Sequence, residues 1–289
     1  MKRILVTGAN GQLGRSLQKL LCEDNEVEAI FTDVDTLDLT EKLSVERFFA
    51  TENFDVIVNC AAYTNVDKAE TDEFLCAKIN KEAVENLAES ARKYKINIIH
   101  ISTDYVFNGE NNRPYDENDT PAPCSVYGRT KLEGEGVLKS FCPSSIIIRT
   151  AWLYSEYGNN FMKTMLRLGD EKEEIGVVSD QIGTPTYAGD LAKIIQELIH
   201  SDNWISGVYH FSNEGVASWY DFSKAIFRVS GNKSIKVNPI RTKDYPTPAK
   251  RPYYSVLNKA KIKKTYGIEI PHWEDSLAEC IKEFEKLDK

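Results

Sequence analysis

Tyr127 and Lys131 are the residues whose types and spacing point most directly to chemistry. They stand four positions apart at the start of a helix that we expect over residues 126–139, so the phenol and the ammonium lie one turn apart on the same face. Reduction of a carbonyl needs a hydride source and a proton donor for the developing alkoxide. A phenol can be that donor because a nearby cation and a nicotinamide would lower its pKa from about 10 toward neutrality. We therefore expect Tyr127 to donate a proton and Lys131 also to hold the nicotinamide ribose.

Spacing alone does not single out this pair, since about one Tyr/Lys pair at four-residue spacing arises by chance in such a chain. Tyr220 and Lys224 form a second pair, with no glycine turn or hydroxyl-bearing strand end beside it, and we interpret it as packing. Tyr127 instead follows an expected strand over residues 96–102, and the ligand crevice of an open α/β sheet lies at the carboxyl ends of its strands. Thr103, at that strand end, is by itself equally typical of a turn, but beside Tyr127 it is a candidate to orient the carbonyl.

Three glycines, Gly8, Gly11 and Gly14, lie between an expected strand over residues 3–7 and an expected helix over residues 12–22. Glycines in this position allow a tight turn, a close approach to a pyrophosphate and close contact of helix and sheet, while the helix N-terminus attracts negative charge. Such spacing arises by chance about 0.05 times in a chain of this composition. The pattern predicts a dinucleotide site, and its alternative is a plain strand-to-helix turn.

Asp33 stands at the end of the second expected strand, 25 residues after Gly8. A carboxylate at this spacing hydrogen-bonds an adenosine ribose and repels a 2′-phosphate, which favours NADH over NADPH. Asp35 and Asp38 lie nearby, and an acidic strand end in solvent would look the same. The choice between NADPH and NADH therefore stays open.

The elements that must position these residues alternate between short apolar strands and longer amphipathic helices, which is typical of βαβ units around a parallel sheet. We expect strands over residues 3–7, 27–32, 55–60, 96–102 and 145–150, and helices over residues 12–22, 44–51, 72–93 and 126–139. The strands are rich in β-branched residues, as strands buried on both faces should be. Right-handed crossovers would stack these units into an α/β fold with a doubly wound parallel Rossmann sheet.

The alternation becomes less regular after residue 150. We expect a dinucleotide-binding domain over residues 1–150 and mainly a smaller substrate-binding lobe over residues 151–289. Some segments between about 175 and 211 are expected to return to the Rossmann domain, because 175–178 and 208–211 resemble strands and 190–200 a helix.

Composition excludes several classes of protein. The 289 residues, 42% hydrophobic and 28% charged, are ordinary for a globular chain, and the formal net charge of −8 disfavours nucleic-acid binding. No stretch approaches the roughly 20 apolar residues of a membrane span. The six Cys contain no Cys-x-x-Cys pair, and the four His have no metal-ligand spacing. We therefore expect a cytoplasmic protein with reduced thiols and without a nucleic-acid or membrane partner.

Further segments along the chain carry a family resemblance. Besides the glycine turn and the Tyr/Lys pair they are Asn-Cys-Ala-Ala-Tyr-Thr (59–64), Val-Asp-Lys-Ala-Glu (66–70), Ser-Thr-Asp-Tyr-Val-Phe (102–107), Arg-Thr-Ala-Trp (149–152), Asn-Asn-Phe-Met (159–162) and Pro-Thr-Pro-Ala-Lys-Arg-Pro (246–252). Over essentially the whole chain they resemble the extended short-chain dehydrogenase/reductases. The later motifs are most similar to those of the members that reduce dTDP-4-keto-6-deoxy sugars. The resemblance implies NAD(P)H-dependent reduction of the 4-keto group of dTDP-4-dehydro-L-rhamnose to dTDP-L-rhamnose.

The resemblance also implies roles for single residues. Thr103, Tyr127 and Lys131 would be catalytic. Beside the glycines and Asp33, the cofactor would contact Gln12 and Leu13 at the pyrophosphate, Asp38 and Leu39 at the adenine, and Ala62, Tyr63 and Thr64 past the third strand. The substrate would contact Thr103, Asp104, Trp152, Asn160, Lys250 and Arg251, the last two as a diphosphate clamp. The alternatives are a core aromatic for Trp152, a turn former for Asp104 and a solvated pair for Lys250 and Arg251.

One position departs from the family pattern. In some of the reductases that this chain resembles, a glutamate two positions after the last glycine of the turn bridges a dimer through a metal ion. This chain has Ser16 at that position. We therefore expect no metal, and a monomer or a homodimer.

Two other functions fit the same motifs less well. A nucleotide-sugar 4,6-dehydratase or epimerase would resemble Thr-Asp-Glu after the fourth strand, whereas this chain has Thr103-Asp104-Tyr105 and lacks the second carboxylate for acid/base elimination. A non-catalytic nucleotide-binding subunit would share the fold. The presence of Thr103, Tyr127 and Lys131 together argues against it.

Overall fold

A parallel six-stranded sheet forms the centre of the protein in a computed structural model that describes residues 1–232 and 234–287. From one edge to the other the strands are β2 (Val27–Thr32), β1 (Lys2–Thr7), β3 (Val56–Asn59), β4 (Asn97–Thr103), β5 (Ile146–Thr150) and β10 (Gly207–His210). Every neighbouring pair is parallel. The chain moves outward in both directions from β1, so a crevice opens at the carboxyl ends of β1 and β3. The predicted doubly wound Rossmann sheet is confirmed.

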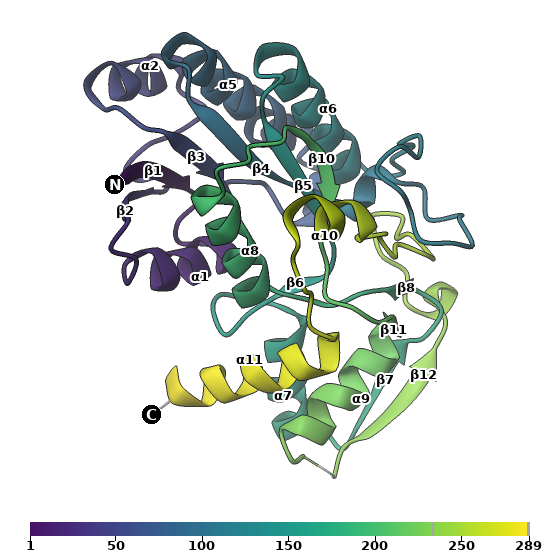
Figure 1. Cartoon of the computed structure of the whole chain (residues 1–289). Helices are drawn as coiled ribbons and strands as arrows, with labels where there is room; N and C mark the ends of the chain where they lie inside the picture. Colours follow the sequence, from purple (N-terminus) through teal and green to yellow (C-terminus); the bar gives the residue numbers. More distant parts are fainter. Residues whose placement is uncertain (233, 288–289) are drawn as a thin grey trace.

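Helices cover both faces of this sheet (Figure 1). One face is covered by α1 (Gln12–Leu21), α8 (Ala188–His200) and α10 (Ala260–Tyr266), and the other by α2 (Lys42–Thr51), α5 (Ala83–Tyr94) and α6 (Val126–Phe141). Alternate side chains of a strand point to opposite faces, so Ile4 and Val6 of β1 pack toward α1 while Leu5 packs toward α2 and α5. Both faces are therefore apolar, which explains the nearly continuous hydrophobic strands.

The helix expected over residues 72–93 is interrupted in the structure. It consists of α4 (Glu73–Ala77), one wide π-helical turn η1 (Lys78–Glu82) and α5, and a short α3 (Val66–Ala69) precedes it. The buried Asn80 lies in the wide turn, and its carbonyl is so close to Gly134 of α6 that a Cβ there would lie 2.3 Å from the oxygen. The extra residue in the turn lets α6 pack close to η1, an arrangement that periodicity does not predict.

The C-terminal part has a hydrophobic core of its own, which lies below the sheet in Figure 1. It contains α7 (Phe161–Glu171), α9 (Trp219–Val229) and α11 (Trp273–Leu287), beside the paired strands β7 (Glu174–Val178) and β12 (Lys236–Ile240). Short strand pairs join β6 (Leu153–Tyr154) to β9 (Thr186–Tyr187) and β8 (Ile182–Gly183) to β11 (Ala217–Ser218).

The segment 175–211 is divided between the two parts. Strand β10 joins the edge of the main sheet and α8 packs on α1, whereas β7 pairs with β12 and stays outside that sheet. The expectation that residues 175–178 return to the Rossmann sheet is therefore wrong, because their β-type sequence finds its partner 62 positions later in the chain, where Lys236 pairs with Glu174.

Among the residues that the structure describes, no helix is both long and apolar enough to cross a lipid bilayer. The six cysteines are free thiols. Ser16 is buried in α1 and donates its hydroxyl to the Gln12 carbonyl.

Candidate active site

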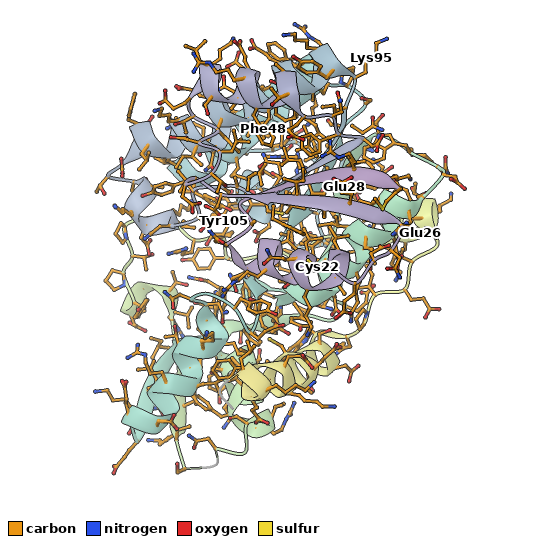
Figure 2. The ribbon with its side chains drawn as sticks, turned by 90° about the vertical axis from the view of Figure 1, so that its left-hand side faces the viewer. Cys22, Glu26, Glu28, Phe48, Lys95 and Tyr105 are labelled. Atoms are coloured by element: carbon orange, nitrogen blue, oxygen red, sulfur yellow. The ribbon has the colours of Figure 1, made fainter. Side chains whose placement is uncertain are left out.

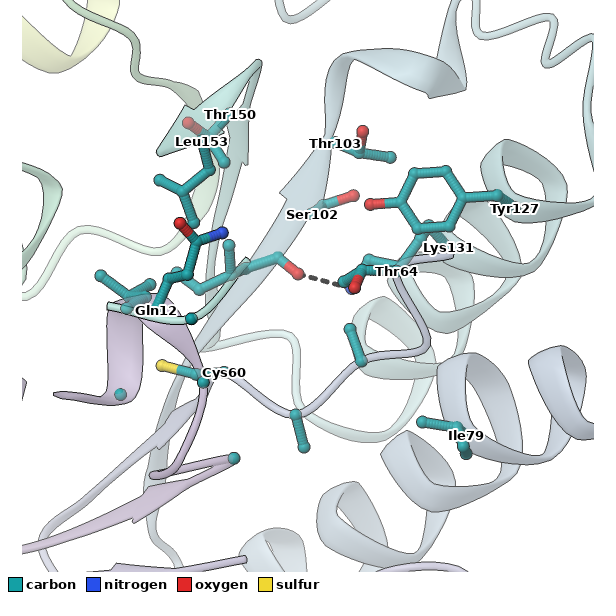
Figure 3. Close-up of a pocket in the computed structure, with 18 of the residues that line it drawn as sticks. Gln12, Cys60, Thr64, Ile79, Ser102, Thr103, Tyr127, Lys131, Thr150 and Leu153 are labelled. Atoms are coloured by element: carbon teal, nitrogen blue, oxygen red, sulfur yellow. Dashed lines mark hydrogen bonds between the residues drawn. The ribbon is translucent and has the colours of Figure 1, made fainter. Parts of the chain in front are cut away.

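A cavity of about 890 Å³ opens at the carboxyl ends of the central strands. It extends from the glycine turn after β1, past the ends of β3 and β4, to residues of the C-terminal part. Ser102, Thr103 and Tyr127 gather on one side of it, and Gln12 and Cys60 approach from the other (Figure 3). Most residues predicted to bind cofactor or substrate line this single cavity.

The glycine turn has a geometry that larger residues cannot adopt. Gly8 has a φ of +64°, and a Cβ on it would lie 2.6 Å from the Ala61 nitrogen. A Cβ on Gly14 would lie 2.4 Å from the Gly8 carbonyl oxygen. Helix α1 begins after Gly11, which has no side chain to cap the first-turn N–H groups. Those donors are left for an anionic ligand, so the turn fits a dinucleotide pyrophosphate.

At the other end of this crevice two carboxylates hold the loop that follows β2. Asp33 accepts hydrogen bonds from the backbone N–H groups of Asn10 and Val34, both at 2.8 Å. Asp38 accepts from the backbone N–H of Thr40 at 2.9 Å and from its hydroxyl at 2.7 Å. Both carboxylates line the cavity together with Leu39, whereas Asp35 is exposed outside it. This placement suits contacts with an adenosine ribose and adenine.

The Tyr/Lys pair occupies the start of α6, facing β4. Ser125 caps the helix by accepting from the Gly128 N–H at 3.1 Å, which sets Tyr127 in the first turn. The ring of Tyr105 meets that of Tyr127 edge to face, with centroids 5.5 Å apart. Lys131 is 2% exposed, and its Nζ donates to the Ile101 carbonyl at 2.6 Å. The phenol and the ammonium thus lie on the same face of the helix, as predicted.

The protonation of these groups follows mainly from burial. Desolvation raises the pKa of the Tyr127 phenol above its ordinary value, with the Thr103 hydroxyl opposing the change. Sequence reasoning expected a lower pKa, but the Lys131 ammonium is turned toward Ile101, so among the chain's own groups burial prevails. Burial also lowers the pKa of Lys131 to about 8, partly offset by the charge of Glu135.

Asp104 and Trp152 form the side of the cavity next to the C-terminal part. Asp104 accepts from the Thr103 hydroxyl at 3.0 Å, and burial raises its pKa to about 6. Its buried Oδ2 has no hydrogen-bond partner among the described residues. Trp152 has a φ of +47° and stacks on Trp219 of α9 with centroids 3.6 Å apart. Asp104 and Trp152 thus contribute a carboxyl group and a flat apolar wall to the cavity lining.

Only some of the remaining predicted residues line the cavity. Arg251 lines the cavity, where it pairs with Asp67 at 2.5 Å. Lys250 lies outside the cavity lining, with its side chain 56% exposed and 3.7 Å from Glu110, so the structure does not bring the two basic residues together as a clamp. Tyr63 also lies outside the lining, although Ala62 and Thr64 belong to it.

Asn160 lines the cavity as the N-cap of α7 and donates to the Gln12 side-chain oxygen at 2.9 Å. It therefore touches a predicted cofactor residue directly.

Sequence reasoning missed several lining residues. Trp219 was assigned no role, and nothing in its spacing relates it to Trp152. Tyr105 belongs to the motif 102–107 but was given no role, although its hydroxyl accepts from Arg251 at 2.9 Å. Figure 2 places Tyr105 where the sheet-bearing part meets the C-terminal part. Only the position of Tyr105 beside Asp104 could have indicated it in advance.

The Rossmann sheet, the glycine turn and the Tyr/Lys pair beside a strand-end hydroxyl define an extended short-chain dehydrogenase/reductase. Within this class the chain belongs to the family described as the RmlD substrate binding domain, whose model matches residues 1–286.

Known proteins similar to this chain carry consistent names. The dTDP-4-dehydrorhamnose reductase of Aggregatibacter actinomycetemcomitans is 45% identical over 287 residues, which cover 96% of this chain and 97% of that protein. A crystal structure of a dTDP-4-dehydrorhamnose reductase from Clostridium acetobutylicum is 47% identical, with a TM-score of 0.94 and coverage of 98% and 99% of the two chains. The Bacillus anthracis enzyme of that name, solved in complex with NADP, is 41% identical, with a TM-score of 0.93 and the same coverage.

Replacing Gly14 by Ala should disrupt the glycine turn, because the new Cβ would meet the Gly8 carbonyl oxygen at 2.4 Å, which only a backbone shift can relieve. We expect a lower melting temperature and loss of NADPH binding, measured by fluorescence titration. Gly136→Ala is the matched control, since Gly136 also lies in a helix and a Cβ there meets nothing within 4 Å. That variant should bind NADPH normally and gain up to about 1 kcal/mol of stability. Equal NADPH affinity of both variants would contradict the role of the turn.

Proposed function

We propose that this chain is a dTDP-4-dehydrorhamnose reductase, which reduces the 4-keto group of dTDP-4-dehydro-L-rhamnose to give dTDP-L-rhamnose with NADPH or NADH. The observation that carries the proposal is one cavity in which Thr103, Asp104 and Tyr127 lie beyond a dinucleotide-type glycine turn. The family and the names of relatives matched over nearly the whole chain support the same activity and its place in dTDP-rhamnose biosynthesis.

The cofactor would be held by the glycine turn at its pyrophosphate, by Asp33 and Asp38 at the adenosine end, and by Lys131 at the nicotinamide ribose. When bound, the reduced nicotinamide supplies the hydride. The turn fits this group because Gly8 and Gly14 leave space that any Cβ would fill. The choice between NADPH and NADH depends on Asp33, whose carboxylate borders the cavity at the end of β2.

Tyr127 would donate the proton to the ketone oxygen. Its raised pKa keeps the phenol protonated throughout the neutral range, as a proton donor requires. Thr103 would orient the carbonyl, and the Asp104 carboxyl beside it in the cavity lining would contact the sugar. We assign Trp152 to the apolar face of the sugar and Arg251 to the diphosphate. Asn160 would also contact the substrate from the cavity lining, where its side chain bonds Gln12.

The alternative of a 4,6-dehydratase or epimerase is less well supported by the site. Those reactions need a second proton carrier after the fourth strand, and this chain places Tyr105 there. The Tyr105 hydroxyl is held by Arg251, and burial raises the pKa of the phenol. Tyr105 is therefore a poor substitute for a carboxylate base.

The proposal also includes the domain organisation of the chain. Residues 1–150 would form the dinucleotide-binding domain and residues 151–289 mainly the substrate-binding lobe, with α8 and β10 attached to the former. We place the enzyme in the cytoplasm, as a monomer or homodimer that acts on a small molecule without nucleic acid or membrane.

The direct test of the function is cofactor consumption. Purified protein should oxidise NADPH or NADH only when freshly prepared dTDP-4-dehydro-L-rhamnose is added, with dTDP-L-rhamnose identified by NMR. Absence of consumption with that substrate would reject the proposed activity. A product that has lost water or is inverted without net reduction would favour the alternative.

Tyr127→Phe removes the proton donor while keeping the ring against Tyr105. We expect turnover to fall by about 10² to 10⁴ with little change in cofactor affinity, because the hydroxyl acts in the chemical step. Steady-state kinetics and NADPH titration measure the two effects. Tyr220→Phe, in the second Tyr/Lys pair outside the cavity lining, should keep full turnover. If both variants behave alike, Tyr127 is not the donor.

Asp33→Ala tests the cofactor preference. Without its carboxylate the end of β2 no longer repels a 2′-phosphate, so the ratio of kcat/KM for NADPH to that for NADH should rise. Asp35→Ala, two residues further on and exposed, serves as the control and should leave the ratio unchanged. An unaltered ratio in Asp33→Ala would show that the ribose contact lies at another residue.

A further inference from the structure

A row of buried polar side chains lies behind Lys131, next to the active-site cavity. Asn59 at the end of β3 is 2% exposed and His100 of β4 is fully buried. The Asn59 Nδ2 lies 3.0 Å from the His100 Nδ1, and the His100 Nε2 lies 3.5 Å from the Lys131 Nζ. Neither Asn59 nor His100 lines the cavity, so neither can touch substrate. His100 can act on the reaction through the Lys131 side chain, which does line the cavity.

The direction of these contacts is set by a backbone group. The Ala61 N–H can only donate, and it meets the Asn59 Oδ1 at 3.1 Å. The Thr7 hydroxyl also donates to this oxygen, at 2.7 Å. The Asn59 amide is thereby oriented with its NH₂ group toward His100, so the His100 Nδ1 must accept. Burial lowers the pKa of His100 well below its ordinary value, so the ring is neutral and carries its single proton on Nε2.

We propose that Asn59 and His100 are positioning residues that present an Nε2–H to the Lys131 Nζ and so favour the neutral amine of Lys131 over its ammonium. This inference rests on the proposed function, in which Lys131 acts beside Tyr127. An ammonium has three donors and no acceptor, so it cannot accept from the imidazole N–H, whereas an amine can. The two distances fit this polarity. The Lys131 Nζ lies 2.6 Å from the Ile101 carbonyl, which can accept from it, but 3.5 Å from the His100 Nε2, which carries a proton and cannot accept.

Other groups around Lys131 do not cancel this effect. Glu135 of α6 is the acid that acts on it, but that carboxylate is bound by Arg149 of β5 at 2.7 and 2.8 Å and by the Ser102 hydroxyl at 2.6 Å. Cys60 after β3 and Cys76 of α4 also face Lys131, and burial raises the pKa of both thiols, so they are uncharged. Lys131 therefore holds its proton weakly, in agreement with its lowered pKa of about 8.

The expected consequence is a pH limit on catalysis. With the ammonium of Lys131 as the active form beside Tyr127, turnover falls as the pH rises through the pKa of Lys131. A partner that accepts from Lys131 would raise that pKa and move the fall to higher pH. The imidazole N–H of His100 instead lowers the pKa of Lys131 and moves the fall in turnover to lower pH. Lys131 can therefore lose and regain its proton near neutral pH.

Asn59→Asp reverses the polarity of the row in a nearly isosteric way. A carboxylate still accepts from the Ala61 N–H, but it also accepts from His100, so the ring proton moves to Nδ1 and the bare Nε2 accepts from Lys131. We expect the alkaline limb of kcat/KM to move upward by about one pH unit. A limb that stays in place, or moves down, would overturn the proposal.

The new charge at position 59 could raise the pKa of Lys131 without any change in His100. The same substitution is therefore made in a His100→Phe background, where a buried ring remains but no nitrogen faces Lys131. The proposal requires most of the upward shift to disappear in that background, as coupling within a double-mutant cycle. If Asn59→Asp shifts the alkaline limb equally in both backgrounds, the new charge acts without His100, and the assignment to His100 fails.

Two NMR measurements test the proposal without turnover. Two-bond ¹H–¹⁵N spectra of the four histidines, assigned with His100→Phe, should show the Nε2–H form for His100 in the unaltered protein. Lysine labelled at the ε-carbon, assigned with Lys131→Met, should give a higher pKa for Lys131 in Asn59→Asp. An Nδ1–H form of His100 overturns the proposal even if no variant folds. A protein that shows both expected NMR results but reduces no dTDP-sugar would refute the proposed function and leave the effect of His100 on Lys131 in place.

Discussion

The position of the Tyr127 phenol depends on how helix α6 is held against strands β4 and β5. Tyr127, Lys131 and Glu135 follow one another at four-residue spacing, so they lie along one face of the helix. Lys131 bonds the Ile101 carbonyl of β4, and Glu135 bonds Ser102 of β4. Two of the three side chains thus determine the rotation of α6, and the third, Tyr127, is carried to the strand ends by that rotation.

The strongest part of this attachment is a buried ion pair. Arg149 is 1% exposed and Glu135 is fully buried, and they share two hydrogen bonds. Such a pair contributes little net stability compared with apolar residues of the same size, because both charges must lose their water. Removing one partner, however, leaves a charge buried without compensation, which costs about 3–5 kcal/mol. The pair therefore acts mainly on geometry: it disfavours other registers between α6 and the sheet.

Much of this arrangement could be predicted from the sequence, and the limits have identifiable causes. The glycine turn, Tyr127, Lys131 and Thr103 were found because local spacing places them at strand ends, and a Rossmann sheet brings all strand ends together. Trp219 was missed because it reaches the cavity through the packing of the C-terminal core, and no local pattern encodes that. Lys250 and Arg251 are neighbours in the chain, yet the pairing of Arg251 with Asp67 leaves them pointing to different surroundings. The effect of burial on Tyr127 likewise depends on residues distant in sequence.

The hydrogen bond between Gln12 and Asn160 ties the first residue of α1 to the cap of α7, across 148 positions of sequence. One end of this bond belongs to the glycine turn, the proposed pyrophosphate site, and the other to the start of the C-terminal part. A hinge motion that swings the C-terminal part away from the sheet must stretch or break this link. The two ends of the cavity are therefore mechanically coupled through the Gln12 side chain.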